Sequence, residues 1–565
     1  IYKFLLGHPD TMEFGRKFKI AFSGCADKPC ALTNMHDFGL IARLRQQGGN
    51  EVRGFKFVVG GGLGAVPFEA QTLYEFLPVT ELLPVAQCVS RVYARLGEKN
   101  NRAMARIKFL VKKLGIDEFR RLVEEERKVV PVDPRWTSLV EGLENHFDQP
   151  LKAGAPFSGK PTGAFATWMR TNVETQKQAG YYSVLVTVPL GDLSADQMRG
   201  IADLARRTTG GHVRFSIEQN VVIRYVSGAD IESLYHDLEK LGLAKSHAGT
   251  IADITACPGT DTCKLGTSSS RGLAFELQER LTARLEGMDP EVEKMKIKIS
   301  GCFNSCGQHH VAQLGFYGVS RKKDGKAVPY FQIVLGGRWS QKPGSYGLPV
   351  AAIPSKNVPA FIDAILDHYV SNRQSGESFS DYIARLGKKE VRVLIEPFAE
   401  IPAYDVNPDP YHDWGDARLY STDDKGIGEC AGEVVSLFDF EINESERQAF
   451  DGQLALEEGH FTEAVNLATR SMISGARALV RLQYRDLSQD PQVIAQEFKQ
   501  RFCDTGEFED KRRSRIADYF FKAVAASSAR SSWNGDDARQ ALQEAYLFSD
   551  KVHTCSQKLT QTATK

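Results

Sequence analysis

The sequence lacks the features that mark several classes of protein. Its 71 Lys and Arg residues balance its 71 Asp and Glu residues, so the net charge favours neither a nucleic acid nor a membrane surface as a partner. It contains no run of about 18 apolar residues, and its first residues, IYKFLLGHPD, are too few and too polar for the apolar core of a signal peptide. These absences predict a soluble protein, which we expect in the cytoplasm.

Cysteine is also scarce, with ten residues in a chain of 565. This density is far below that of a small secreted protein held together by disulfides. Four of the cysteines form two close pairs, Cys257 with Cys263 and Cys302 with Cys306. The grouping favours a metal site in a reducing compartment over a disulfide framework.

Two motifs occur twice in the chain, which indicates a duplicated domain. RKFKIAFSGC at residues 16–25 matches EKMKIKISGC at 293–302, and GFKFVVGGGLGAVP at 54–67 matches PYFQIVLGGRWSQKP at 329–343. The cysteines that end the first motif are 277 residues apart, at positions 25 and 302. The second copy begins with strand and helix patterns well upstream, and the same offset would place their counterpart before residue 1. We therefore expect the first copy to lack its beginning, on the order of a hundred residues.

The remaining patterns predict an α+β fold followed by an all-α region. At about 100–200 residues per domain, the chain has room for three or four domains. A Gly, Pro and Ser-rich linker follows the first repeat, a Pro-rich acidic stretch follows the second, and beyond it the periodicity is helical. The predicted parts are 1–150 for the first repeat, 161–250 and 251–395 for the two parts of the second repeat, 396–440 for a connector and 441–565 for a helical domain.

The two cysteine pairs have the spacings C-x5-C and C-x3-C. Four thiolates suit either a 4Fe–4S cluster or a tetrahedral zinc ion. Zinc ribbons favour closer pairs, so the C-x5-C spacing favours the cluster. Buried cysteines without any ligand remain the other alternative.

The paired segments ACPGTDTCKLG and KISGCFNSCGQHH resemble the signature of the sulfite and nitrite reductase haemoproteins, and the duplicated organisation is similar over residues 1–395. The resemblance implies that 1–150 and 251–395 bind sirohaem and the cluster, with 161–250 as a ferredoxin-like half-domain. It also implies that Cys306 joins the cluster to the sirohaem iron and that Asn304 tunes the site. The implied cluster ligands are Cys257, Cys263, Cys302 and Cys306.

A glycine-rich stretch at residues 60–65, GGGLGA, also satisfies the G-x-G-x-x-A pattern of dinucleotide-binding loops. Pro67 would interrupt a helix that starts after this stretch, and the matching segment of the second repeat lacks the G-x-G-x-x-A pattern. We therefore interpret Gly60, Gly61 and Gly62 as a loop whose N–H groups approach an anion. By resemblance, this anion is a sirohaem carboxylate.

The cations Arg16, Lys17 and Lys19 precede the first Gly turn. In a strand alternate residues share a face, so Lys17 and Lys19 would point the same way. Without the resemblance, the K-x-K pattern would indicate only two lysines on the solvent-exposed edge of a strand. The resemblance instead implies a catalytic lysine pair that binds the substrate anion and supplies protons.

The K-x-K pattern is that of the sulfite-reducing branch of the family, whereas Cys306-Gly307-Gln308 resembles the nitrite branch as closely. The predicted function is the six-electron reduction of sulfite to sulfide, with nitrite reduction to ammonia as the alternative. Two alternatives come from other classes of function: an iron–sulfur electron carrier without haem, and a scaffold protein held together by zinc. Because no flavin fold or convincing nicotinamide site is evident, we expect electrons from a separate ferredoxin or flavoprotein.

Overall fold

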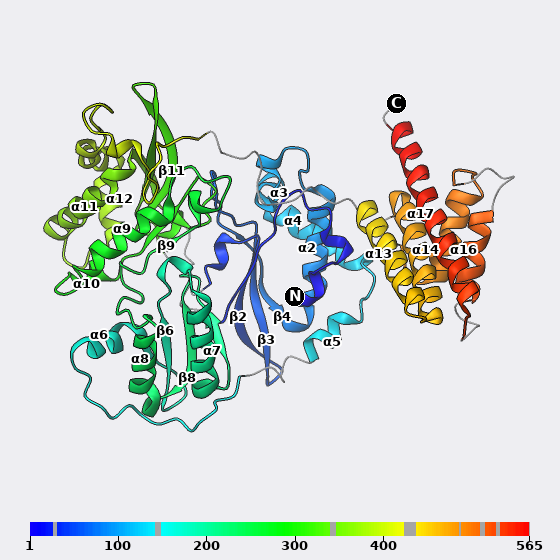
Figure 1. The fold of residues 1–565 in the computed structure, drawn as a ribbon, viewed down its shortest axis with the longest axis horizontal. Coiled ribbons are helices and arrows are strands. Elements are labelled where there is room, and N and C mark those ends of the chain that lie inside the picture. The colour runs from blue at the N-terminus through cyan, green and yellow to red at the C-terminus, as the bar shows by residue number, and fades with distance from the viewer. Residues whose placement is uncertain are drawn as a thin grey trace. The chain divides into compact units, whose positions relative to one another are not determined.

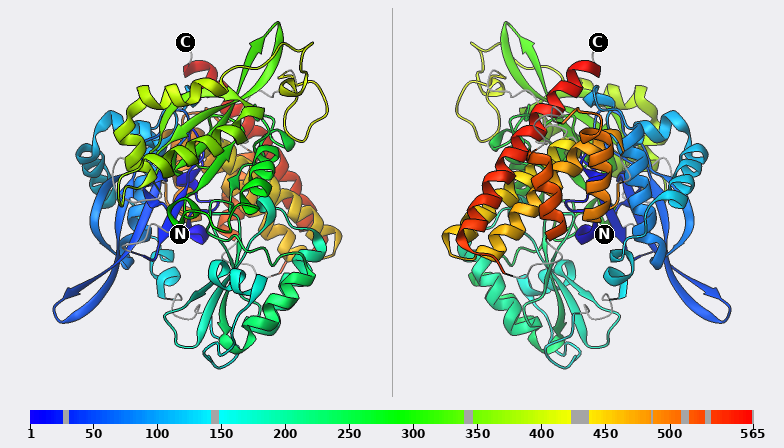
Figure 2. Two further views of the ribbon diagram at one scale, coloured as in Figure 1. Left: turned by 90° about the vertical axis from the view of Figure 1, so that its left-hand side faces the viewer. Right: turned by 90° about the vertical axis from the view of Figure 1, so that its right-hand side faces the viewer.

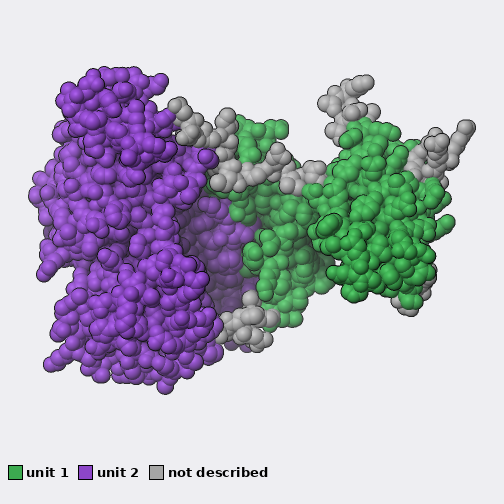
Figure 3. Space-filling model, in the orientation of Figure 1, with its two compact units in different colours: residues 1–18, 80–141, 432–565 green, residues 19–79, 142–431 purple. Residues whose placement is uncertain are grey.

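The computed structural model describes residues 1–25, 31–141, 148–338, 346–422, 437–484, 487–508, 515–526 and 532–563. The chain divides into two compact units, shown in Figure 3. Unit 1 consists of residues 1–18, 80–141 and 432–565, and unit 2 of residues 19–79 and 142–431. Among the described helices, none is both long and apolar enough to span a bilayer.

The first sheet of unit 2 has four strands in the order β1-β2-β3-β4 (Figure 1). Strand β1 runs parallel to β2 with Ile20 opposite Phe38, and the other pairs are antiparallel. Gly48 and Gly49 form the turn between β2 and β3 with φ of 59° and 84°, which a residue with a side chain rarely adopts. The strands are β1 (Ile20–Ser23), β2 (Phe38–Gln47), β3 (Asn50–Val59) and β4 (Gln71–Pro78).

A second sheet of unit 2 repeats this arrangement and adds one strand. Its order is β13-β12-β11-β10-β9, and β10 runs parallel to β11 with Ile297 opposite Leu314. Even the irregular contacts recur: the Lys19 N–H donates to the Asp37 carboxylate, and the Lys296 N–H donates to the side-chain oxygen of Gln313. The predicted duplication is therefore confirmed. The strands are β9 (Thr255–Ala256), β10 (Ile297–Ser300), β11 (Leu314–Lys323), β12 (Lys326–Leu335) and β13 (Leu348–Pro354).

Among the described residues, helices α9, α10, α11 and α12 all contribute to the main apolar core of the second sheet. Residues of α9 (Ser270–Thr282), α11 (Val358–Asn372) and α12 (Phe379–Ile395) pack against β10 to β13 in this core. The short helix α10 (Pro290–Glu293) precedes β10 and is capped by the Asp289 carboxylate. This packing fixes the ends of β9 and β10, where the cysteine motifs begin.

The third sheet of unit 2 has the antiparallel order β5-β6-β8-β7. Helix α7 starts at a capping box formed by Ser194 and Gln197, as its polar N-terminal sequence favours. The elements are α6 (Gly163–Asn172), β5 (Val173–Thr175), β6 (Tyr181–Val186), α7 (Ala195–Thr209), β7 (Val213–Phe215), β8 (Val221–Ser227) and α8 (Ile231–Lys240).

Unit 1 is helical in its described residues. Its helices from the first repeat are α1 (Tyr2–Leu5), α2 (Leu82–Leu96), α3 (Ile107–Leu114), α4 (Ile116–Val129) and α5 (Arg135–Glu141).

The C-terminal part of unit 1 is all-α, as predicted. Helix α14 packs against α13 and α17, and the three run side by side in Figures 1 and 2. The rings of Phe498, Phe520 and Phe548 meet in its buried core. The helices are α13 (Leu437–Glu457), α14 (Phe461–Gln483), α15 (Pro491–Phe498), α16 (Arg515–Ala526) and α17 (Gly535–Ala563).

Candidate functional site

The fold brings the two cysteine motifs together at one edge of the second sheet. Cys257 follows β9, and Cys302 lies two residues beyond β10. Strands β9 and β10 are neighbours and run parallel, so their carboxyl ends lie side by side. The Cys257 N–H donates to Ile299 O at 3.1 Å, which fixes the start of the first motif against the second.

Glycines in these motifs allow the backbones to approach closely. A Cβ added to Gly301 would lie 2.6 Å from Gly259 Cα, closer than side chains allow. The N–H groups of Thr267 and Ser268 both donate to Gly301 O, at 2.7 and 3.1 Å. The loop after Cys263 is therefore bonded directly to the residue before Cys302.

Hydrogen-bond donors reach the sulfur atoms of Cys257 and Cys302. The Gly301 N–H donates to Cys257 Sγ at 3.1 Å. Burial raises the pKa of the Cys302 thiol, hydrogen bonds from Asn304 lower it, and the neighbouring sulfur groups of Cys257 and Cys306 raise it. Donors to sulfur stabilise the thiolate form that iron requires, so the donor set fits a cysteine-bound cluster.

The cysteines differ in exposure. Cys302 is buried, Cys257 and Cys263 are half-buried, and Cys306 is exposed. Within the part of the chain that the structure describes, no three Cys, His, Asp or Glu side chains are grouped so as to hold a metal ion. The structure thus brings the motif backbones together without drawing the four sulfurs into one ligand group.

Lys298 is a site residue that the sequence interpretation missed. Its side chain is 1% exposed and donates to Thr255 Oγ1 at 3.3 Å and to Gln308 Oε1 at 3.1 Å. Burial lowers the pKa of Lys298 to about 7. This lysine connects the strand before Cys257 to the turn after Cys306. A charged residue inside the short apolar strand IKIS was the signal that could have identified it.

The predicted cations lie before β1, not within it. The expectation of a strand at residues 16–19 was wrong, because β1 begins at Ile20. The Asp37 carboxylate accepts the Lys19 N–H at 2.9 Å and takes the place of a strand partner. Lys19 is exposed, and Lys17 is half-buried. Arg16 is half-buried and donates to Arg102 O at 2.8 Å within unit 1.

The glycine loop does not present its first three N–H groups to a ligand, contrary to the prediction. Gly60, Gly61 and Gly62 donate to the carbonyl oxygens of Asp37, His36 and Phe68, at 2.9 to 3.0 Å. Gly61 is required for another reason, because a Cβ there would overlap Asn34 O.

The same loop contacts the cysteine region of the second repeat. Gly64 O accepts a hydrogen bond from His310 Nε2 at 3.0 Å. Through this hydrogen bond the two repeats meet beside the turn that follows Cys306.

A cavity of about 780 Å³ lies beside Cys263 and is closed on one side by residues of the connector. Within it Asp413 is buried, and its carboxylate accepts the N–H groups of Ser269 at 2.7 Å and Trp414 at 2.9 Å. Burial raises the pKa of Asp413 to about 6, against these hydrogen bonds, which lower it.

This pKa predicts a pH-dependent stability. Because the folded pKa exceeds the unfolded value of about 3.9, Asp413 contributes stability below about pH 4 that is lost as the pH rises through 6. Between about pH 4 and pH 6, the free energy of unfolding of the wild type should fall by up to about 3 kcal/mol relative to that of Asp413→Asn. Above this interval the difference between the two proteins should stay constant. Unfolding curves of both proteins between pH 4 and 8 measure the difference, and parallel pH profiles would contradict the prediction.

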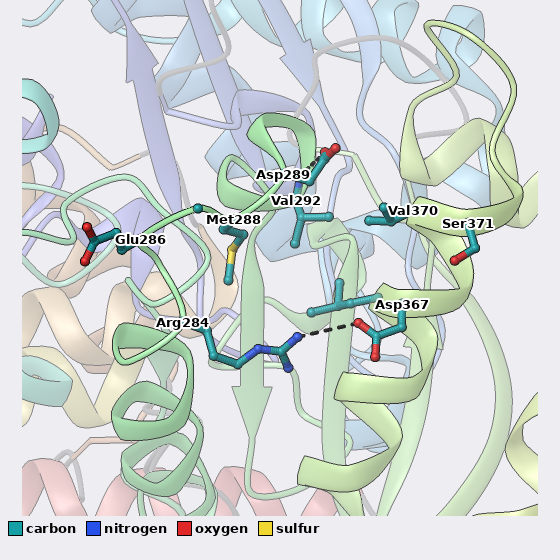
Figure 4. A pocket seen from close by; sticks show the side chains of 10 residues that line it. Arg284, Glu286, Met288, Asp289, Val292, Asp367, Val370 and Ser371 are labelled. Carbon is teal, nitrogen blue, oxygen red and sulfur yellow. Dashed lines mark hydrogen bonds and ion pairs between the residues drawn. The ribbon is translucent and has the colours of Figure 1, made fainter.

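A second cavity, of about 670 Å³, is lined by the loop from Arg284 to Asp289, by Val292 of α10 and by α11 (Figure 4). Two of its charged groups, Arg284 and Asp367, pair with each other at 3.5 Å, and Asp289 pairs at 2.6 Å with Arg373, which does not line the cavity. None of the predicted site residues lines it.

Two family descriptions match the chain. The nitrite and sulphite reductase 4Fe-4S domain matches residues 1–130 and 248–401, and the nitrite/sulfite reductase ferredoxin-like half domain matches residues 174–241. The first match covers half of the chain, so the chain belongs to the nitrite and sulphite reductase family. Proteins of this family carry sirohaem and a 4Fe–4S cluster.

Individual relatives include both kinds of reductase. A protein of Mycobacterium tuberculosis named sulfite reductase (ferredoxin) is 29% identical over 391 residues, which are 68% of this chain and 65% of the relative. An assimilatory ferredoxin-dependent nitrite reductase of Haloferax mediterranei is 28% identical over 392 residues, 68% of this chain and 63% of the relative. The chain thus spans slightly less than two thirds of these relatives' length.

A solved structure supports the same fold. The Mycobacterium tuberculosis NirA protein matches with a TM-score of 0.57 and 27% identity, covering 69% of this chain and 67% of that one.

Proposed function

We propose that this chain catalyses the six-electron reduction of sulfite to sulfide. The observation that carries the proposal is the junction of the two cysteine motifs at the ends of β9 and β10, with a backbone N–H donating to Cys257 Sγ. Cys257, Cys263, Cys302 and Cys306 would hold the 4Fe–4S cluster, and Cys306 would also ligate the sirohaem iron. The bound cofactors would pass electrons from the donor protein to the anion and provide a metal face for it.

Cationic side chains would provide the remaining chemistry. Sulfite is a dianion whose three oxygens must leave as water, so its reduction requires positive charge and a supply of protons. Lys17 and Lys19 are the candidates for both tasks, and Arg16 would add charge beside them. The exposed side chain of Lys19 is accessible to a small anion.

Electrons would come from a separate protein. Both relatives described above have ferredoxin in their names, which favours a ferredoxin over a flavoprotein as the donor. We place the reaction in the cytoplasm, where thiolates remain reduced.

Nitrite reduction to ammonia is the second candidate, because a nitrite reductase is nearly as similar to this chain as a sulfite reductase is.

Two measurements test the proposal. The visible spectrum should show the Soret and red bands of sirohaem, whereas a bare cluster would give only a broad shoulder and zinc no absorption. With reduced methyl viologen as donor, kcat/KM should be higher for sulfite than for nitrite. The reverse order would establish the nitrite alternative.

A further inference from the structure

The connector contains a closed loop at residues 402–422, directly after the last residue of the family match at 401. The loop returns on itself, because the Tyr420 N–H donates to Tyr411 O at 2.9 Å and His412 pairs with Leu419. Tyr411 is fully buried in a small apolar cluster with Val328 and Tyr330 of β12. We call residues 402–422 the strap; it is anchored to the second sheet.

Two buried side chains of the strap hold the loop that follows Cys263. The Asp413 carboxylate accepts the Ser269 N–H at 2.7 Å, at the residue that caps α9. The Tyr420 hydroxyl donates to Thr267 O at 2.6 Å, and its ring is only 8% exposed. The Thr267 N–H donates in turn to Gly301 O, so Thr267 links Tyr420 of the strap to the residue before Cys302.

Further contacts fix the strap in the same place. Trp414 Nε1 donates to Ser355 O at 3.1 Å, and the Lys356 ammonium lies 4.1 Å from the centre of the Trp414 indole. A Cβ on Gly272 in the first turn of α9 would overlap Trp414 O. The strap therefore approaches the helix that follows the cysteine loop as closely as backbone packing permits.

The cavity beside Cys263 lies between these elements. One wall is the cysteine loop, with Thr260, Cys263, Lys264 and Gly266, and the other is the strap from Asp413 to Thr422. Movement of the strap would open this cavity and release the loop that carries Cys263.

We propose that the strap is a positioning element that keeps the Cys263 loop closed and so retains the cluster, with Tyr420 and Asp413 as its positioning residues. The proposal rests on the proposed assignment of Cys263 as a cluster ligand. The strap begins directly after residue 401, where the family match ends.

The test compares two buried hydroxyls of the strap. Tyr420→Phe removes the hydrogen bond to the cysteine loop, whereas Tyr411→Phe removes one to Pro402 O, at 3.1 Å, inside the strap itself. The rate of iron release from the anaerobic holoprotein to a chelator is measured by loss of cluster absorbance. Cys263 alkylation by iodoacetamide is followed in parallel by mass spectrometry.

We expect Tyr420→Phe to speed both processes about fivefold to tenfold, the effect of one buried hydrogen bond, and Tyr411→Phe to leave them unchanged. Equal rates for the two variants would overturn the proposal. If Tyr420→Phe does not fold, Asp413→Asn takes its place in the test. The asparagine amide keeps one acceptor oxygen and loses the other. Wild-type rates of iron release and alkylation in Asp413→Asn would also overturn the proposal. A Cys263→Ser protein with its full iron content would instead refute the ligand assignment and leave the strap contacts as packing.

Discussion

A Cys306→Ser protein is expected to lose both the cluster and sirohaem. If one thiolate serves both iron centres, a hydroxyl that remains protonated at neutral pH removes a ligand from each of them. Cys306 is exposed, so the substitution leaves no cavity and the fold should persist. Iron, acid-labile sulfide and sirohaem per chain in the purified protein measure the outcome.

Two comparisons make this result specific. Cys257→Ser should lose the cluster first and keep more of the sirohaem, because Cys257 is proposed to bind only the cluster. Cys503→Ser, in the C-terminal helices, should keep both cofactors. A Cys306→Ser protein with full haem and cluster content would show that the two centres do not share this thiolate.

Lys19→Asn should lower sulfite turnover by a hundredfold to a thousandfold. The amide can still donate a hydrogen bond but has no charge, and the loss of one preorganised donor typically costs about 2.7–4 kcal/mol of transition-state stabilisation. Nitrite carries a single charge and has two oxygens to remove, so its turnover should fall much less. The measurement is kcat/KM for both anions with reduced methyl viologen, which bypasses the protein donor.

The duplication supplies a matched control for this prediction. Lys296 occupies the place of Lys19 in the second repeat: its N–H donates to Gln313, while its ammonium donates to Gly249 O at 2.9 Å. Lys296→Asn should leave both activities near the wild-type value. Equal losses for sulfite and nitrite in Lys19→Asn would remove the basis for preferring sulfite.

The duplicated fold could be predicted because its signal is periodic and local. Matching motifs end at Cys25 and Cys302, and the parallel strand pairs begin at equivalent residues, Ile20 opposite Phe38 and Ile297 opposite Leu314. The junction of the cysteine pairs also followed from the motifs and the family resemblance. The start of β1 could not be predicted, because it depends on a side-chain acceptor, Asp37, that lies 18 residues beyond Lys19.

Other parts of the site depend on contacts between distant segments. Lys298 meets Thr255 and Gln308 only after β9 and β10 have paired, so no spacing reveals the contact. Asp413 and Tyr420 come from a stretch without periodicity, in which neither helix nor strand patterns could identify buried residues. The prediction that the glycine loop binds an anion was wrong for a similar reason. Glycines in a sequence show that the backbone can bend there, but they do not show which carbonyl oxygens accept its N–H groups.

The strap also determines where this protein can be divided. The family match ends at residue 401, yet a chain shortened there would lose Tyr411 and expose Val328 and Tyr330 on the surface of β12. The Ser269 N–H would lose its carboxylate partner at the cap of α9. The packed interior of unit 2 therefore continues past residue 401 to at least residue 422, and a fragment limited to the family match would lack part of that interior.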